Sequence, residues 1–245
     1  MALIHIRDIP AKNENNDGLN YYFTHEILGL LELNVQNFDP FKDILIKENV
    51  HSDDFIRIYL KHFNPNKKFC SHVLLMDNET NKFLLTDAAM NIEPTLTDLV
   101  KIVENATKFW YKLNPDDELY YHTIHVNFVN YSGSFSIKNK DSITANNLKT
   151  YFEINEPGKY YFTNWQIDTC LYPESRKAKS AESLLSPNII VVPNISVGNA
   201  IYKCLMHEYN CLGFLVGGTR AAVLNSRSDL DKNQQCIKMI NELDL

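Results

Sequence analysis

The stretch PNIIVVPNISVGNAIYKCLMHEY (187–209) decides the fold class. Its first part, residues 187–194, is a continuous apolar run between two prolines, which is typical of a parallel strand covered on both faces. Its second part, residues 198–209, predicts a helix that opens with Gly198-Asn199. A buried strand followed by a helix is the unit from which α/β proteins are built.

The same alternation extends outward from this stretch in both directions. Apolar runs predict strands at 3–6, 43–47, 71–77, 82–89, 123–130, 159–168, 211–218 and 221–225. Helical spacing of apolar residues predicts helices at 21–33, 49–63, 95–109, 142–152, 177–186 and 229–243, with Ser52 able to cap the second. The order of these segments predicts α/β layers around a mostly parallel sheet.

Composition narrows the class of protein. The chain has 245 residues, of which 44% are hydrophobic and 22% charged, as in a globular protein of one large or two small domains. A net charge of −6 without a basic stripe argues against binding to a nucleic-acid backbone. No segment approaches the roughly 18 consecutive apolar residues of a membrane span, and the N-terminus does not resemble a signal peptide. We therefore expect a cytoplasmic protein without membrane contact.

Neither a disulfide framework nor a metal site is predicted. The five cysteines are odd in number, scattered and without a CxxC pair, so we expect reduced thiols. His122 and His125 lie three apart on an expected strand, which places them on opposite faces. The glycine-rich VGGTR (216–220) lacks the ending of a phosphate-binding P-loop.

Five collinear stretches look familiar when they are read together. They are ILIKENVHSDDFIRIYL (44–60), SHVLLMDNETNKFLLTDAAMNIEPTLTDLVKIVENA (71–106), IDTCLYPE (167–174), PNIIVVPNISVGNAIYK (187–203) and AAVLNSRSD (221–229). In this order they resemble the phosphate acetyl- and butyryltransferase family, and in particular its butyryltransferase branch. TDAAMNIEP and GNAIYK are the most specific of the shared motifs.

The resemblance implies a fold of two three-layer α/β domains flanking a cleft, as in isocitrate and isopropylmalate dehydrogenases. The chain would return to its first domain for the last helix. Domain one, which is shortened here, would comprise residues 1–69 plus 224–245, and domain two residues 70–223. The family also forms homodimers, so self-association is expected on the same ground.

The resemblance further implies transfer of a short-chain acyl group, butyryl or similar, between coenzyme A and inorganic phosphate. Both are substrates, and no bound cofactor is implied. Such an enzyme must bind a dianion, stabilise an oxyanion and deprotonate a thiol with a pKa near 8.5. Arg227 offers a permanently charged fork for phosphate, and Ser226 beside it can donate to the oxyanion.

A carboxylate in the closing segment would then act as the general base. Asp229 and Asp231 are the candidates, although the position that matches the family's acid could also be Asn233. Asp229 is an equally good N-cap of the last helix. Asp87 and Asn91 are expected to brace the cleft rather than to react.

Further phosphate donors are expected on three other segments. They are His51, Ser52, Ser71, His72, Gly198 and Asn199, the last two at an expected helix N-terminus that favours anions. Each has a plainer interpretation, since a histidine or serine beside a helix can bond locally, and a Ser-Arg pair after a strand is often a solvated loop.

Several positions depart from the family pattern. Glu48 stands where the family has glycine and brings negative charge toward the expected phosphate site, Asn194 stands for an aspartate, and Asn225 for a threonine. A catalytically degenerate paralogue that acts as a binding or regulatory protein therefore remains an alternative. A dehydrogenase of the isocitrate or 4-hydroxythreonine-phosphate type is less favoured, because no metal-binding aspartate cluster is evident.

Overall fold

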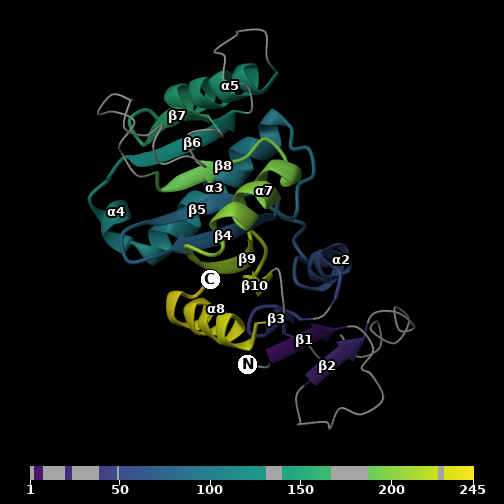
Figure 1. Cartoon of the computed structure of the whole chain (residues 1–245). Coiled ribbons are helices and arrows are strands. Elements are labelled where there is room, and N and C mark those ends of the chain that lie inside the picture. The colour runs from purple at the N-terminus through teal and green to yellow at the C-terminus, as the bar shows by residue number, and fades with distance from the viewer. Residues whose placement is uncertain are drawn as a thin grey trace. The chain divides into compact units, whose positions relative to one another are not determined.

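The computed structural model describes residues 3–7, 20–23, 39–48, 50–130, 140–166, 187–225 and 229–245. Residue contacts divide the chain into two compact units. Unit 1 comprises Met1–His72 and Leu212–Leu245, and unit 2 comprises Val73–Cys211. Both units are built from strands and helices in alternation, so the chain has a mixed α/β fold (Figure 1).

The sheet of unit 1 runs in the order β2-β1-β3-β10-β9. Its strands are β1 (Leu3–Arg7), β2 (Asn20–Phe23), β3 (Ile44–Lys47), β9 (Asn210–Val216) and β10 (Ala222–Val223). Neighbouring strands are parallel from β2 to β10, whereas β10 and β9 are antiparallel. All four residues of β3 are buried, which explains the unbroken apolar run before Lys47.

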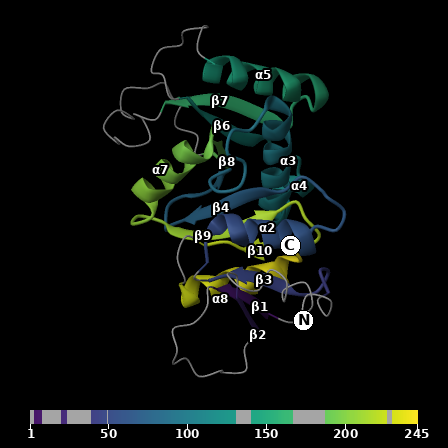
Figure 2. The same ribbon diagram turned by 90° about the vertical axis from the view of Figure 1, so that its right-hand side faces the viewer.

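Helices α2 (Ser52–His62) and α8 (Leu230–Leu243) cover opposite faces of β3 and β10 in unit 1 (Figures 1 and 2). The inward residues of α2 are Phe55, Ile58 and Tyr59, at the three- and four-residue spacing of one helix face. Those of α8 are Asn233, Cys236 and Ile240, so a polar residue lies on the buried face of the last helix.

The sheet of unit 2 runs in the order β4-β5-β8-β6-β7. Its strands are β4 (Ser71–Asp77), β5 (Lys82–Thr86), β6 (Ile124–Asn130), β7 (Tyr160–Gln166) and β8 (Ile189–Val191). β4 and β5 form an antiparallel hairpin, and the other neighbours are parallel. The Asn78 carboxamide oxygen closes the hairpin turn by accepting from the N–H groups of Thr80 and Asn81.

Helices cover both faces of the unit 2 sheet. α7 (Ile195–Leu205) lies on one face, while α3 (Leu96–Leu113) and α5 (Lys140–Asn155) lie on the other (Figures 1 and 2). The short α4 (Pro115–Leu119) follows α3. A reciprocal capping box between Thr95 and Asp98 sets the start of α3, immediately after Pro94.

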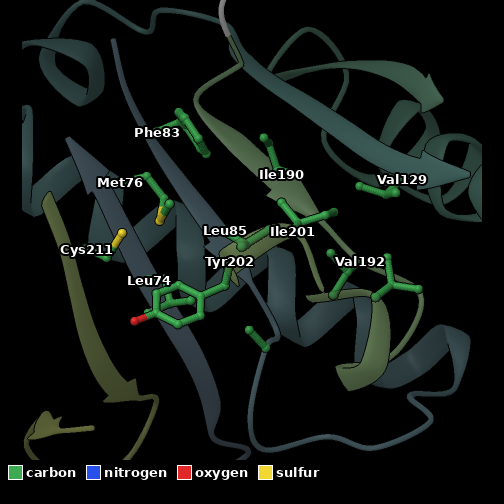
Figure 3. Close-up of a cluster of buried hydrophobic side chains, with 12 residues drawn as sticks. Leu74, Met76, Phe83, Leu85, Val129, Ile190, Val192, Ile201, Tyr202 and Cys211 are labelled. Carbon is green, nitrogen blue, oxygen red and sulfur yellow. The ribbon is translucent and has the colours of Figure 1, made fainter. Parts of the chain in front are cut away.

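One core cluster of unit 2 lies between α7 and the sheet. Leu74 and Met76 of β4, Leu85 of β5 and Ile190 of β8 meet Ile201 from the helix (Figure 3). Because β8 is paired on both sides and fully buried, its residues are apolar on both faces, as the run at 187–194 predicts.

Three sequence-based element boundaries are wrong. α7 begins at Ile195 and not at Gly198, because Asn194 caps it by accepting a hydrogen bond from the Val197 N–H at 3.0 Å. α2 begins at Ser52, with His51 in the N-cap position, so Ser52 is the first helical residue and not the cap. The start of the expected helix at 21–33 is wrong, because Asn20–Phe23 form the edge strand β2 and pair with β1. The remainder of that helix, residues 24–33, and the expected helix at 177–186 lie outside the described residues.

No helix in the described part of the chain has the length and apolarity that a bilayer span requires.

Candidate functional site

Ser226 and Arg227, the first candidates for chemistry, lie outside the described residues, together with Ser228. The structure describes the residues on either side of them, Asn225 after β10 and Asp229 before α8. Only three residues therefore separate two fixed points of unit 1.

The end of β10 is held by Gly213 of β9 and by His72, both residues of unit 1. The Leu224 N–H donates to the Gly213 carbonyl at 2.9 Å, and the Gly213 N–H donates to the Asn225 side-chain oxygen at 2.8 Å. The Leu224 carbonyl accepts from His72 Nε2 at 3.2 Å. Because a carbonyl only accepts, Nε2 of His72 carries a proton in this arrangement.

Gly213 is required by this packing. A Cβ atom at this position would lie 2.1 Å from the Leu224 oxygen and 3.2 Å from His72 Nε2. Real side chains do not approach backbone oxygens so closely, so only glycine allows β9 and the end of β10 to meet.

Asn225 also reaches the last helix. Its Nδ2 donates to Asn233 Oδ1 at 2.8 Å and lies 3.7 Å from Cys236 Sγ. Asn225, Asn233 and Cys236 are at most 4% exposed. Burial raises the pKa of the Cys236 thiol to about 12, which makes it a packing group and not a nucleophile.

The two aspartates proposed as general base have different surroundings. Asp229 is the N-cap of α8, and its Oδ1 accepts from the Lys232 N–H at 3.1 Å. Asp231 lies exposed in the first turn of the same helix. Capping therefore already occupies one oxygen of Asp229, as its plainer interpretation predicts.

His51 and Ser52 lie at the start of α2, after β3. The His51 ring is mostly exposed, its Nδ1 lies 3.5 Å from an Asp53 carboxylate oxygen, and it makes no side-chain capping bond with any described residue. Between β3 and this helix, Glu48 is buried, and the Lys47 ammonium lies 3.5 Å from the Glu48 carbonyl. The contact between His51 and Asp53 does not identify His51 as a phosphate ligand.

Ser71 and His72 are both buried in β4, at 0% and 4% exposure. His72 is used structurally, because it holds the Leu224 carbonyl one residue before Asn225. The sequence places it near the anion-binding segment through the family resemblance, and the structure connects it to the strand that precedes that segment.

Gly198 and Asn199 belong to unit 2 and do not lie at a helix N-terminus. The Gly198 N–H donates within α7, to the Asn194 carbonyl, so it is not available to an anion. Asn199 is exposed on the second turn. Gly198 is needed for packing, because its Cβ would lie 2.9 Å from Ala88 Cα and 3.1 Å from Val192 Cγ2.

Asp87 is a buried carboxylate of unit 2, at 1% exposure. Its oxygens accept from the N–H groups of Ala89 and Met90 and from Asn91 Nδ2, the last at 2.5 Å. The hydrogen bonds of Asp87, including the one from Asn91, therefore stabilise the loop after β5. Gly198 packs against this loop.

Among the described residues, no group of three histidine, cysteine or carboxylate side chains could hold a metal ion. His122 pairs with Asp117 at 3.0 Å, and His125 packs against the Tyr161 ring. The two histidines thus have separate local partners, but the expectation that both lie on one strand is wrong, because β6 begins at Ile124 and His122 precedes it.

Gly213 is the residue of this region that sequence reasoning missed, and Asn233 was considered only as a position for the base and not for its bond to Asn225. Glycine is scarce, at 8 of 245 residues, so a glycine inside an apolar strand was a signal of close backbone approach. Asn233 gives a weaker signal, as a polar residue at a buried helical position.

The model of the phosphate acetyl/butaryl transferase family matches residues 43–240. The chain belongs to this family. Among its relatives, phosphate acetyltransferase of Mycoplasma capricolum is 26% identical over 182 residues, which are 72% of this chain and 53% of the relative. Phosphate butyryltransferase of Clostridium acetobutylicum is 27% identical over 197 residues, covering 76% of this chain and 63% of the relative.

The chain thus spans about half the length of the first curated relatives that it matches. Solved structures agree on the fold. A branched-chain phosphotransacylase from Enterococcus faecalis superposes with a TM-score of 0.71 at 23% identity, over 100% of both chains. A phosphotransacetylase from Streptococcus pyogenes gives 0.60 at 20% identity, over 82% of this chain and 62% of that one.

Proposed function

We propose that this protein transfers a short-chain acyl group, butyryl or a similar one, between coenzyme A and inorganic phosphate. Membership of the phosphate acetyl/butyryl transferase family over residues 43–240 supports this activity. The observation that carries it at the level of residues is the double anchoring of Asn225 and Asp229, which flank Ser226 and Arg227. A short segment between two held points suits a residue that must meet a charged substrate in one position.

In the reaction, a phosphate oxygen attacks the carbonyl carbon of the thioester. The new C–O bond forms, the C–S bond breaks, and coenzyme A leaves as a thiolate that takes up a proton. Arg227 binds the phosphate through its planar fork, and Ser226 donates to the oxyanion that develops on the carbonyl oxygen. Coenzyme A and phosphate are substrates in this scheme, which needs no bound cofactor.

The reverse reaction needs the coenzyme A thiolate, hence a base. Asp231, which is exposed in the first turn of α8, is the better placed of the two aspartates, because Asp229 is already engaged as a cap. The amide of Asn233 cannot take a proton in this pH range. His51, Ser52, Ser71 and His72 remain proposed phosphate-side residues of unit 1, and Asn199 of unit 2. Gly198 is not proposed again, because its N–H is bonded within α7.

The finer features of the family belong to the same proposal. They are two domains of the isocitrate dehydrogenase type with a cleft between them, a homodimer and a cytoplasmic location. The first domain would comprise residues 1–69 plus 224–245, and the second residues 70–223. Family membership supports each of them.

A degenerate paralogue that binds ligand without turnover is the second candidate. The buried Glu48 and the amide Asn233 favour it, because one adds a carboxylate near the expected anion site and the other offers no base.

Phosphorolysis of acyl-CoA separates the two candidates. Acetyl-, propionyl-, butyryl- and branched acyl-CoA are each incubated with inorganic phosphate, and thioester absorbance is followed together with released thiol. The enzyme-only thiol signal is subtracted, because Cys204 is exposed. We expect turnover, fastest with butyryl- or branched acyl-CoA. No turnover with any of the four, combined with measurable phosphate binding, would favour the paralogue.

A further inference from the structure

Ile92 lies on the loop that joins β5 to α3, and its residue surface is 73% exposed. Isoleucine is among the residues that folded proteins bury most often. A single exposed apolar residue is nevertheless ordinary on a protein surface. Its place in the fold must therefore decide whether the side chain has a use.

The loop that carries Ile92 is held by hydrogen bonds on both sides of it. Before it, the Asp87 carboxylate accepts from the N–H groups of Ala89 and Met90 at 3.1 and 2.9 Å. At Ile92 itself, the backbone carbonyl accepts from the Ile195 N–H at 3.3 Å. The backbone of Ile92 is thus tied to the first residue of α7, while its side chain stays exposed.

This loop leaves the sheet of unit 2 at the carboxyl ends of parallel strands. Thr86, the last residue of β5, pairs with Val191, the last residue of β8. Val191 pairs in turn with Phe128 near the end of β6. Because these strands are parallel and in register, their carboxyl ends meet at one edge of the sheet.

The helices that follow these strands lie on opposite faces. α3 follows β5 and α5 follows β6 on one face, whereas α7 follows β8 on the other (Figures 1 and 2). The chain therefore changes face on either side of β8. In open α/β sheets, ligands bind outside the carboxyl ends of the strands at such switch points. The bond between Ile195 and Ile92 joins the two segments that leave this one.

The surroundings of Ile92 limit the kind of ligand that its side chain can contact. Glu93 beside it is exposed, and so is Ser196 in the first turn of α7. One apolar side chain with polar neighbours is far smaller than the roughly 800 Å² that each partner buries in a stable protein complex. A short apolar group at the end of a polar substrate has the matching size.

We propose that Ile92 is a specificity-determining residue that contacts the acyl chain of the thioester. The inference rests on the proposed function and concerns the part of the substrate that the family leaves open. Each methylene of a longer chain adds apolar surface that the contact removes from water. The side chain of Ile92 therefore favours butyryl-CoA over acetyl-CoA.

Three variants isolate this contact. Ile92→Ala removes most of the side chain, and Ile92→Leu keeps its volume. Ile154→Ala is the matched control, because Ile154 has the same exposed fraction of 73% and lies on α5. Since both isoleucines are exposed, neither alanine variant leaves a cavity in the core.

Steady-state phosphorolysis with the full chain compares acetyl-CoA with butyryl-CoA. We expect Ile92→Ala to lower kcat/KM about fivefold or more with butyryl-CoA and less than about twofold with acetyl-CoA. The KM for phosphate, and all rates of Ile92→Leu and Ile154→Ala, should stay within about twofold of the unchanged protein. Equal losses with both thioesters would indicate contact with their common part and overturn the proposal. An unaltered preference in Ile92→Ala, or the same change of preference in Ile154→Ala, would overturn it too.

Calorimetric titration without phosphate gives a readout that does not depend on turnover. The Kd for butyryl-CoA should be lower than that for acetyl-CoA, and the ratio of the two should shrink in Ile92→Ala but not in Ile154→Ala. If this pattern is found in a protein that shows no turnover with phosphate, the proposed function fails and the acyl contact stands. A ratio that Ile92→Ala retains, or no preference in the unchanged protein, overturns the acyl contact whether or not the protein turns over.

Discussion

The geometry of the strand end that precedes Ser226 and Arg227 depends on single atoms, and Gly213 is the clearest example. An added Cβ would lie 2.1 Å from the Leu224 oxygen, and backbone cannot yield as a flexible side chain can. We therefore expect Gly213→Ala to lower the free energy of unfolding by about 1–3 kcal/mol or more, measured by urea denaturation. Gly158→Ala is the comparison, because nothing lies within 4 Å of its Cβ position although its φ is +84°. An unchanged free energy of unfolding in Gly213→Ala would contradict the close-approach argument, whereas a loss in Gly158→Ala reports only the strain of its positive φ.

Asp229 allows capping and catalysis to be separated at one residue. Asn225 and Asp229 flank residues 226–228, but only Asp229 carries a carboxylate that could act as the base. Asp229→Asn keeps a cap oxygen for the Lys232 N–H and removes the carboxylate. We therefore expect an unchanged free energy of unfolding and a turnover within about threefold of the unchanged protein. Asp229→Ala should lower the free energy of unfolding by about 1 kcal/mol. A large loss of turnover in Asp229→Asn at unchanged stability would instead identify Asp229 as the base.

Among the elements, α7 shows what the sequence can and cannot predict. The apolar run at 187–194 correctly predicts a buried parallel strand, because a strand paired on both sides and covered on both faces has no polar side. The start of the helix was placed three residues late, since Gly-Asn is typical of a helix N-terminus. The structure shows instead that Asn194 is the cap and that Gly198 serves packing.

The role of Gly198 in packing α7 against the loop after β5 can be tested by substitution. Alanine is favoured over glycine inside a helix by about 1 kcal/mol, but here its Cβ would lie 2.9 Å from Ala88 Cα. We expect the contact to decide the sign, so that Gly198→Ala lowers the free energy of unfolding by about 1–3 kcal/mol. Asn199→Ala, one residue further on an exposed position, should be neutral or slightly stabilising. A stabilised Gly198→Ala variant would show that α7 can move away from the loop after β5.

At the scale of the whole molecule, the α/β class and the family followed from the order of strands, helices and motifs. The site was less accessible to sequence reasoning. The bond from Gly213 to Asn225 joins residues 12 apart, and that from His72 to Leu224 joins residues 152 apart, so neither leaves a local pattern. The sequence marked Ser226 and Arg227 by resemblance, while the residues that hold their neighbours become visible only in the fold.

Because two thiols of unit 1 are buried, the free energy of unfolding depends on pH in the alkaline range. Burial raises the pKa of Cys70 to about 11 and that of Cys236 to about 12, whereas in the unfolded chain a thiol titrates near 8.5. As the pH rises above about 8.5, the unfolded chain loses these protons first, so the free energy of unfolding falls until the folded values are passed.

Urea denaturation between pH 7 and pH 10.5 measures this dependence. The fall above pH 8.5 should become shallower in Cys236→Ser, because its hydroxyl does not titrate there, whatever the absolute stability of the variant. The same change at exposed Cys204 is the control and should leave the slope unaltered. An identical slope in Cys236→Ser and in the unchanged protein would contradict a protonated, buried thiol at this position.

We propose that Arg227 binds phosphate for acyl transfer, and phosphorolysis of butyryl-CoA by Arg227→Ala tests this role. We expect the loss of a charged, bidentate contact to lower kcat/KM by about 100-fold or more while the protein stays folded. Arg57→Ala is the matched control, because it removes an exposed arginine of α2 that pairs with Asp54. The account predicts unchanged turnover in the control and near-abolished turnover in Arg227→Ala, and equal, unchanged rates in the two variants would contradict it.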